Sequence, residues 1–313
     1  MKNSKKLIGA IAALVIALAV SVGSTFAWFT TNKKVAVDNI QATVTTGSTD
    51  LQVRRVKKDG TAIGDGEWSY GLIFDEDEFD NVKLDALTSA DKGKTLTGKP
   101  NLTTPSTAGD KGIPNYKADG TKDTDKTANY IELYLEFRST AAETIVLDAT
   151  SAVTGESKGD DVILAWKDDS STYGTAINKG AAIASNAKNA VRVSIGKVAS
   201  SEETVVGVWN PNATEGYFKG NLAQDYELYQ DAQFNSEKNK EAINTIYTDP
   251  GYDAITTGTG ATDLVTLGNL NNGYYYAVIC VKIWLEGTDG DCFNNIFDDS
   301  ILAKLVFSIK ETV

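Results

Sequence analysis

The sequence predicts an all-β protein in which two antiparallel sheets pack as a β-sandwich. Within residues 130–138, Ile131, Leu133, Leu135 and Phe137 alternate with polar side chains, which is typical of a strand that buries one face. Further runs rich in β-branched residues are separated by polar turns. The regular crossover helices that a parallel α/β sheet needs are missing from the sequence. These three observations favour the sandwich class.

The expected strands follow one another along the chain. The first covers residues 35–44, where Val35, Val37, Ile40 and Val44 give the segment a β-branched character. A Thr-Gly-Ser turn separates it from the second. The remaining expected strands are 51–56, 130–138, 144–147, 190–195, 204–209, 274–286 and 302–309.

Two insertions interrupt the single domain that is expected for residues 28–313. Residues 88–128 are rich in Lys, Asp, Gly and Thr and hold three of the five prolines, so they are interpreted as a long exposed polar loop. Residues 210–262 form the second insertion. One helix is predicted within residues 221–246, because large apolar side chains recur there at roughly helical spacing.

Residues 1–27 have the pattern of a hydrophobic signal helix. Residues 2–6 carry three lysines and no acid, residues 7–22 form an apolar run, and Thr25-Phe26-Ala27 places small side chains at the two positions that a signal peptidase reads. Cleavage is therefore predicted between Ala27 and Trp28. The mature protein is expected to be secreted, in the extracellular matrix or at the cell surface.

A retained membrane anchor is the alternative interpretation of the same segment. Extending the apolar stretch to Phe29 gives about 20 residues, which is enough to cross the hydrocarbon of a bilayer, and Lys33 and Lys34 follow it. Glycine and serine crowd the end of the run, and no basic cluster lies directly after Ala27, which favours cleavage. With the leader retained, the protein would be membrane-anchored.

Charge and histidine content narrow the classes of function. The net charge is −12, and the leader takes only lysines with it, so a nucleic-acid partner is not expected. The chain contains no histidine, which excludes HExxH zinc sites, Ser-His-Asp triads and Cys-His dyads. A glycosidase that uses two carboxylates, a Ser-Lys arrangement and a calcium-dependent site survive this exclusion, but the acids are too scattered to nominate a pair. The protein is predicted not to be an enzyme.

The acidic segment of residues 75–80 is the candidate metal site, because calcium prefers several carboxylate oxygens on a flexible loop. The EF-hand order of spaced acids, glycine and a terminal glutamate is missing, so a solvated acidic turn is the other interpretation. Asp289-Gly290-Asp291 is a weaker candidate of the same kind. No other cofactor is expected. The calcium candidates are Asp75, Glu76, Asp77, Glu78 and Asp80.

Two cysteines, Cys280 and Cys292, lie in a chain that is predicted to be exported, and disulfides persist outside the cell. A bond between them would close a small loop and stabilise the fold by about 2–3 kcal/mol. Two unpaired thiols are the alternative. If Cys280 lies within a strand and Cys292 in the following loop, their separation could exceed the bridging limit of about 7 Å.

Cleavage would place Trp28-Phe29 at the start of the mature chain, ahead of a β-prone segment. Residues 28–44 would then form an N-terminal arm. Such an arm can add itself to an exposed sheet edge of another copy, with backbone hydrogen bonds providing the affinity. Alternatively, it folds back as an ordinary first strand of its own sheet. The residues of the assembly arm are Trp28, Phe29, Val35, Val37, Ile40 and Val44.

The leader region resembles one known family. Gly23-Ser24-Thr25-Phe26-Ala27-Trp28-Phe29-Thr30, a Val/Ile-rich strand and then Leu51-Gln52-Val53 are similar to the signal region of the TasA/camelysin family of secreted biofilm-matrix proteins. The resemblance implies a jelly-roll-like sandwich, exported by a Gram-positive bacterium through a SipW-type signal peptidase. It also implies polymerisation into fibres, with residues 28–44 donated to the next subunit. The protease activity associated with camelysin is not transferred, because no histidine is present to bind zinc.

The expected function is that of a SipW-dependent, secreted structural protein, a subunit of a biofilm matrix or surface fibre. Its expected partners are itself, as a homopolymer, and other matrix or cell-surface components. The alternative is a monomeric adhesion module that binds a glycan or a host protein through exposed aromatic side chains. Trp68, Tyr70 and Tyr217 are the candidates for that surface.

Overall fold

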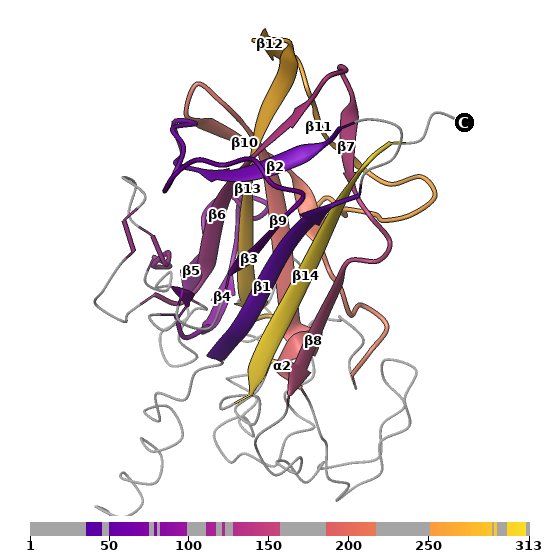
Figure 1. Ribbon diagram of the computed structural model, residues 1–313. Coiled ribbons are helices and arrows are strands. Elements are labelled where there is room, and N and C mark those ends of the chain that lie inside the picture. The colour runs from indigo at the N-terminus through magenta and orange to yellow at the C-terminus, as the bar shows by residue number, and fades with distance from the viewer. Residues whose placement is uncertain are drawn as a thin grey trace, which may run out of the picture. The chain divides into compact units, whose positions relative to one another are not determined.

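The structure is a computed structural model, and all of the residues it describes belong to the compact unit Lys34–Val313, which is separate from the unit Met1–Lys33. Strands dominate this unit (Figure 1), which confirms the prediction of a mainly β protein. None of the described helices has the length and hydropathy needed to cross a membrane. The described residues are 36–45, 50–74, 78–79, 82–98, 111–116, 121–122, 128–156, 186–216, 251–289, 291–292 and 299–310.

The first sheet contains six strands, and its centre is the pair β14 and β1. Every pairing in this sheet is antiparallel except that between β1 and β14, which is parallel. Strand β8 extends the sheet beside the first half of β14, and β7 lies beside its second half. The strands in order are β11 (Asp263–Thr266), β7 (Thr144–Leu147), β14 (Ser300–Ile309), β1 (Ala36–Val44) and β3 (Gly71–Phe74), with β8 (Ala152–Glu156) also on β14.

The second sheet contains eight strands built around β13, which pairs antiparallel with both β9 and β6. Its long strands are β10 (Glu202–Trp209), β9 (Val191–Ala199), β13 (Tyr274–Glu286), β6 (Ile131–Ser139) and β2 (Gln52–Val56). The short strands at its margins are β4 (Ala86–Thr88), β5 (Thr97–Gly98) and β12 (Asn269–Asn271), and the helix α2 (Ala187–Ala190) leads into β9.

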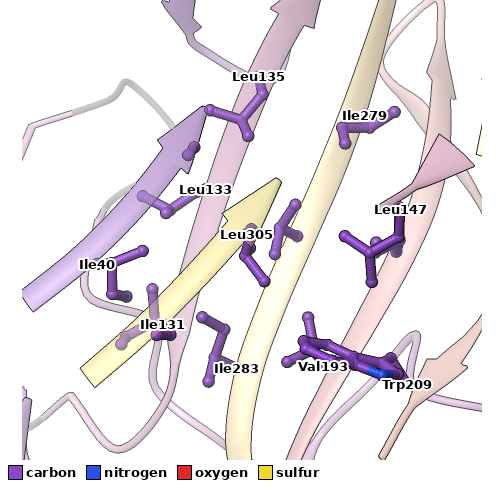
Figure 2. Close-up of a cluster of buried hydrophobic side chains, with 14 of the residues drawn as sticks. Ile40, Ile131, Leu133, Leu135, Leu147, Val193, Trp209, Ile279, Ile283 and Leu305 are labelled. Atoms are coloured by element: carbon purple, nitrogen blue, oxygen red, sulfur yellow. The ribbon is translucent and has the colours of Figure 1, made fainter. Parts of the chain in front are cut away.

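Apolar side chains from both sheets form one buried cluster (Figure 2). On β6, Leu133, Leu135 and Phe137 are at most 1% exposed, while Tyr134 and Glu136 between them are half-buried, as the alternating pattern predicts. The ring of Phe137 packs edge-on against that of Phe307 on β14, with centroids 5.0 Å apart. The inner faces of the two sheets therefore share a core, and Ile40 of β1 is fully buried in it.

The described parts of the polar segment 88–128 combine exposed loop residues with a few paired and buried ones. It contains β5, which pairs with β4, and its Leu96 is only 2% exposed. Leu96 belongs to a second, smaller cluster with Tyr130, Val208 and Trp284. The polar composition of this segment did not predict its packing. A few apolar side chains are enough to hold it against the outer face of the larger sheet. The helix expected within residues 221–246 lies outside the described residues.

Gly207 marks a close approach between β10 and the described end of the second insertion, residues 251–262. A Cβ at this position would lie 2.4 Å from the carbonyl oxygen of Asp253, inside van der Waals contact with backbone. We expect Gly207→Ala to reduce the free energy of unfolding by about 1–3 kcal/mol, measured by urea denaturation. Gly268→Ala is the matched control, because its nearest neighbour is 3.9 Å away and its effect should stay within about 0.5 kcal/mol. Equal effects at both positions would contradict this account.

Candidate functional site

Strand β1 fills a slot in the middle of the six-stranded sheet, between β14 and β3. Eight residue pairs connect it to β14, from Ala36 opposite Ser300 to Val44 opposite Phe307, with one irregularity near Asn39. The ladder continues at its end, where the Val44 amide donates to the Tyr70 carbonyl at 3.0 Å. The segment Ala36–Val44 therefore forms an interior strand of the six-stranded sheet.

The core-facing side of β1 explains why the segment takes this place. Ile40 and Ala42 are fully buried, Val44 is 7% exposed, and the intervening Gln41 and Thr43 are half-buried. Removing β1 would take these side chains away and expose the part of the core that they cover. It would also leave unpaired backbone along β14 and β3, which is a template for another strand.

The structure places the described part of the predicted arm in the chain's own sheet, the second of the two alternatives for this segment. Ile40, Val44 and the backbone of Val37, which is the register partner of Ile301, lie in β1. Trp28, Phe29 and Val35 lie outside the described residues, as does the predicted cleavage point between Ala27 and Trp28.

Of the calcium candidates, only Glu78 lies among the described residues; Asp75, Glu76, Asp77 and Asp80 lie outside them. The Glu78 carboxylate accepts hydrogen bonds from Arg55 Nη1 at 2.5 Å and from the Tyr116 hydroxyl. Glu78 therefore forms an ion pair with a guanidinium. Among the described residues, no group of three or more acidic or cysteine side chains is arranged to hold a metal ion.

The pKa of Glu78 predicts how its ion pair responds to pH. Burial favours the neutral acid, but the hydrogen bonds from Tyr116 and Arg55 outweigh it and hold the pKa below the ordinary value of 4.5. A carboxyl with a depressed pKa stabilises the fold above its unfolded pKa, and that stabilisation is lost as the pH falls through the folded pKa. We expect Glu78→Gln to be less stable than the parent at pH 7 in urea denaturation, and the difference to shrink steadily below about pH 4.5. A difference that does not change between pH 7 and pH 3 would contradict this.

Cys280 and Cys292 are both described and both buried, and no disulfide joins them. Cys280 lies in the middle of β13 on the face that carries Lys282, whereas Cys292 packs in the core cluster beyond the end of that strand. From Cys280 to Glu286 the strand alone spans about 20 Å at about 3.3 Å per residue. The structure therefore lacks the bridge given as one alternative, and β13 first carries the chain away from Cys280 before it reaches Cys292.

The two thiols are expected to be unreactive in the native protein. Burial raises the pKa of Cys280 well above its ordinary value, and only the thiolate reacts readily. Ellman's reagent should titrate two thiols per chain after unfolding in urea without reductant, and none within minutes in the native state. Fewer than two thiols in the unfolded, unreduced chain would show that a bridge had formed.

A second candidate site is a pocket of about 390 Å³ on the outer face of the eight-stranded sheet. The end of β2, the start of β10, the first half of β6 and Lys282 of β13 contribute to its lining. The segments 94–96 and 111–116 close its remaining sides. A cavity of this size lies at the lower end of the range for small-molecule sites.

Buried polar groups form the floor of this pocket. The Lys282 ammonium donates to both carboxylate oxygens of Glu203, at 2.7 and 2.6 Å, and to the carbonyl oxygen of Lys94 at 2.8 Å. The side chains of Lys282 and Glu203 are 3% and 7% exposed. Glu203 crosses β9 over Gly196, where an added Cβ would lie 2.8 Å from its Cγ. The missing side chain at Gly196 therefore lets this ion pair form.

A second carboxylate, that of Glu132, lies beside this ion pair and is held by two tyrosines. The Tyr134 hydroxyl donates to Oε1 of Glu132 at 2.8 Å, and the Tyr130 hydroxyl donates to Oε2 at 3.3 Å. Burial raises the pKa of both phenols, and the charge of Glu132 adds to the shift. The two tyrosines therefore stay protonated and act as donors at physiological pH.

Lysines surround the mouth of the pocket. Lys58, Lys94 and Lys111 are exposed, and no ion pair joins them to the carboxylates of the described residues. Six lining residues are basic and three are acidic, in a chain whose net charge is −12. The pocket is a local region of positive charge on an acidic protein.

The structure describes two of the three aromatic candidates for a binding surface, Trp68 and Tyr70. The Trp68 ring stacks with the guanidinium groups of Arg54 and Arg138, each 4.4 Å from the ring centroid. Tyr70 is 50% exposed, and its hydroxyl donates to Asp50 at 2.6 Å. Tyr217 lies outside the described residues. Trp68 thus takes part in an internal stack of aromatic and arginine side chains.

Sequence reasoning missed the pocket, although two signals of it were present. Tyr130, Glu132 and Tyr134 alternate along the polar face of a strand. Lys282 is the single charge in the otherwise apolar run from Tyr274 to Leu285, and such a charge in a buried strand needs a partner.

The function has to be inferred from the fold and from these two sites, because comparison with known proteins gave no match. No protein-family model, no curated protein and no solved structure matched the chain.

Proposed function

We propose that this chain is a secreted structural subunit, a β-sandwich of the jelly-roll type, that assembles with copies of itself by exchanging strand β1. The observation that carries the proposal is the position of β1: it is the first described strand, yet it lies in the interior of a sheet beside the last described strand, β14. A strand in this position can be replaced by the same strand of another copy, which would restore both pairings, with β14 and with β3.

Exchange retains the interactions that hold β1. The same strand from another copy would form the same ladder with β14 and β3 and would bury Ile40 and Ala42 in the same core. Such an exchange is a low-cost route to assembly, and a head-to-tail contact that does not close on itself produces filaments. Filaments are the form expected of a matrix or surface-fibre component.

Export and the absence of catalysis complete the proposal. The leader, with cleavage after Ala27, directs the chain outside the cell and frees residues 28–44 for exchange. A chain without histidine lacks the usual hydrolytic machinery. In this proposal the partners are further copies of the chain, other matrix or cell-surface components, and a SipW-type peptidase during export.

A disulfide lock tests the proposal. Gln41 of β1 is the register partner of Lys304 of β14, and neighbouring strands are about 4.8 Å apart, within the range that a disulfide spans. The double variant Gln41→Cys and Lys304→Cys, made with Cys280→Ala and Cys292→Ala, should stay monomeric by light scattering when oxidised. After reduction the same sample should form large particles and, by electron microscopy, filaments.

The control for the lock is the same alanine background without the two new cysteines. It should assemble with or without reductant, because β1 remains free to exchange. Assembly of the oxidised, locked chain to the same extent as the reduced chain would refute exchange of β1.

A monomeric binding module is the second candidate function, and the pocket on the eight-stranded sheet is the observation that favours it. A reduced, unlocked chain that remains monomeric at high concentration would favour this candidate over the first.

A further inference from the structure

We propose that the pocket on the eight-stranded sheet binds a carboxylate-bearing sugar, the uronic acid unit of an acidic polysaccharide. In this arrangement the sugar hydroxyls donate to Glu132 and Glu203 at the floor, and the sugar carboxylate lies among the lysines at the mouth. The inference does not depend on strand exchange, because the pocket and β1 belong to different sheets.

The charges of the pocket are separated by depth. Its floor offers the carboxylates of Glu203 and Glu132, which accept hydrogen bonds, while Lys58, Lys94 and Lys111 at the mouth are exposed. A ligand that fits this arrangement has hydroxyl donors at one end and a negative charge at the other. A uronic acid has both.

The floor also disfavours simpler anions. Phosphate carries its charge on every face, and at the depth of Glu132 and Glu203 it would meet two carboxylates. Like charges at short distance in a partly buried site repel strongly. A phosphate is therefore confined to the lysines at the mouth, where salt screens the attraction.

The walls suit a sugar ring as well as its hydroxyl groups. Tyr130 and Tyr134 line the pocket together with Leu96 and Pro114, so apolar surface is available beside the two carboxylates. Ligand sites commonly combine such apolar walls with a few fixed polar groups. The hydroxyls of both tyrosines are held by Glu132, which fixes the orientation of the walls.

The buried ion pair of Lys282 and Glu203 is the strongest sign that the floor has a function. Burying two charges costs desolvation energy, and apolar residues of similar size often stabilise a fold as well or better. Gly196 is also required to let Glu203 reach Lys282. The buried ion pair and the glycine at position 196 together place the Glu203 carboxylate at the bottom of the pocket.

Isothermal titration of the full chain with glucuronic acid, galacturonic acid and short oligouronates tests the inference. Saturable binding with a dissociation constant of about 1 mM or tighter is expected for the acids, with at least about tenfold weaker binding of neutral glucose and galactose. Binding should weaken as salt is raised, because the lysines at the mouth are exposed. Inorganic phosphate should compete only weakly.

Variants of the mouth and the floor separate this site from a nonspecific attraction. Lys94→Gln with Lys111→Gln should weaken binding of the uronic acid about tenfold, whereas Lys304→Gln, an exposed lysine on the other sheet, should leave it unchanged. Glu132→Gln should also weaken binding, since an acceptor is lost. A nonspecific trap for anions would instead bind more tightly when Glu132 loses its charge. Thermal unfolding checks that each variant is folded.

Three results would overturn the inference. They are the absence of binding up to about 10 mM of any uronic acid, equal binding of neutral sugars, and phosphate that binds more tightly than the uronic acid. Assembly is measured separately with the disulfide lock, so failure of one proposal leaves the other to its own test.

Discussion

A chain that lacks residues 36–44 is expected to fail to fold on its own, and to recover its fold when a synthetic peptide of sequence AVDNIQATV is added. Without β1, the backbones of β14 and β3 lose their ladder partner and the core loses Ile40 and Ala42. Unpaired edges together with an open core promote aggregation. The peptide restores both because it supplies the same backbone groups and the same side chains.

Circular dichroism and size-exclusion chromatography would follow the recovery. A peptide in which Ile40 and Ala42 are replaced by aspartate is the matched control, because it keeps the backbone but cannot bury its side chains. It should leave the truncated chain unfolded or aggregated. A truncated chain that is folded and soluble without any peptide would contradict the central role given to β1.

Breaking the ion pair between Arg192 and Asp289 is expected to have the largest effect of any single polar substitution among the described residues. Arg192 Nη2 donates to Asp289 Oδ2 at 2.5 Å, and the two side chains are 6% and 0% exposed. Burial raises the pKa of Asp289, although Arg192 favours its charged form. Asp289→Asn keeps the hydrogen bond from the Asp291 amide but leaves the guanidinium buried without a counter-charge. We expect it to reduce the free energy of unfolding by about 3–5 kcal/mol.

The double variant Arg192→Met with Asp289→Asn should recover most of this loss, because the remaining buried charge is removed. Asp253→Asn provides the matched control, since Asp253 pairs with Lys92 at 2.9 Å but both side chains are more than half exposed. It should change stability by less than about 1 kcal/mol. Urea denaturation measures all three, and equal losses for Asp289→Asn and Asp253→Asn would contradict the role assigned to burial.

The sequence predicted the strands well where one face is apolar. The strand expected at 130–138 is Ile131–Ser139, and that expected at 274–286 is Tyr274–Glu286. The sequence could not predict which strands pair. The parallel contact of β1 with β14 joins residues more than 250 positions apart, and an alternating pattern carries no information about its neighbour in a sheet.

The candidate site was predicted in part. The arm was correctly recognised as β-prone, but the residues alone left open whether it pairs within its own sheet, since both outcomes bury the same face. The pocket was missed because its groups come from distant segments: Glu203 reaches Lys282 over Gly196, and Lys94 adds its carbonyl oxygen. Such a site depends on tertiary packing, which local patterns do not specify.

Mixing two single-cysteine chains is the most direct test of strand exchange. One chain carries Gln41→Cys, the other Lys304→Cys, and both have Cys280→Ala and Cys292→Ala. If β1 of one copy lies beside β14 of another, oxidation of the assembled mixture links the two kinds of chain into covalent dimers on a nonreducing gel. Replacing the second chain by one with Lys197→Cys, an exposed position on the other sheet, should give none. A mixture that assembles but forms no Gln41→Cys to Lys304→Cys dimer would show that β1 stays in its own chain.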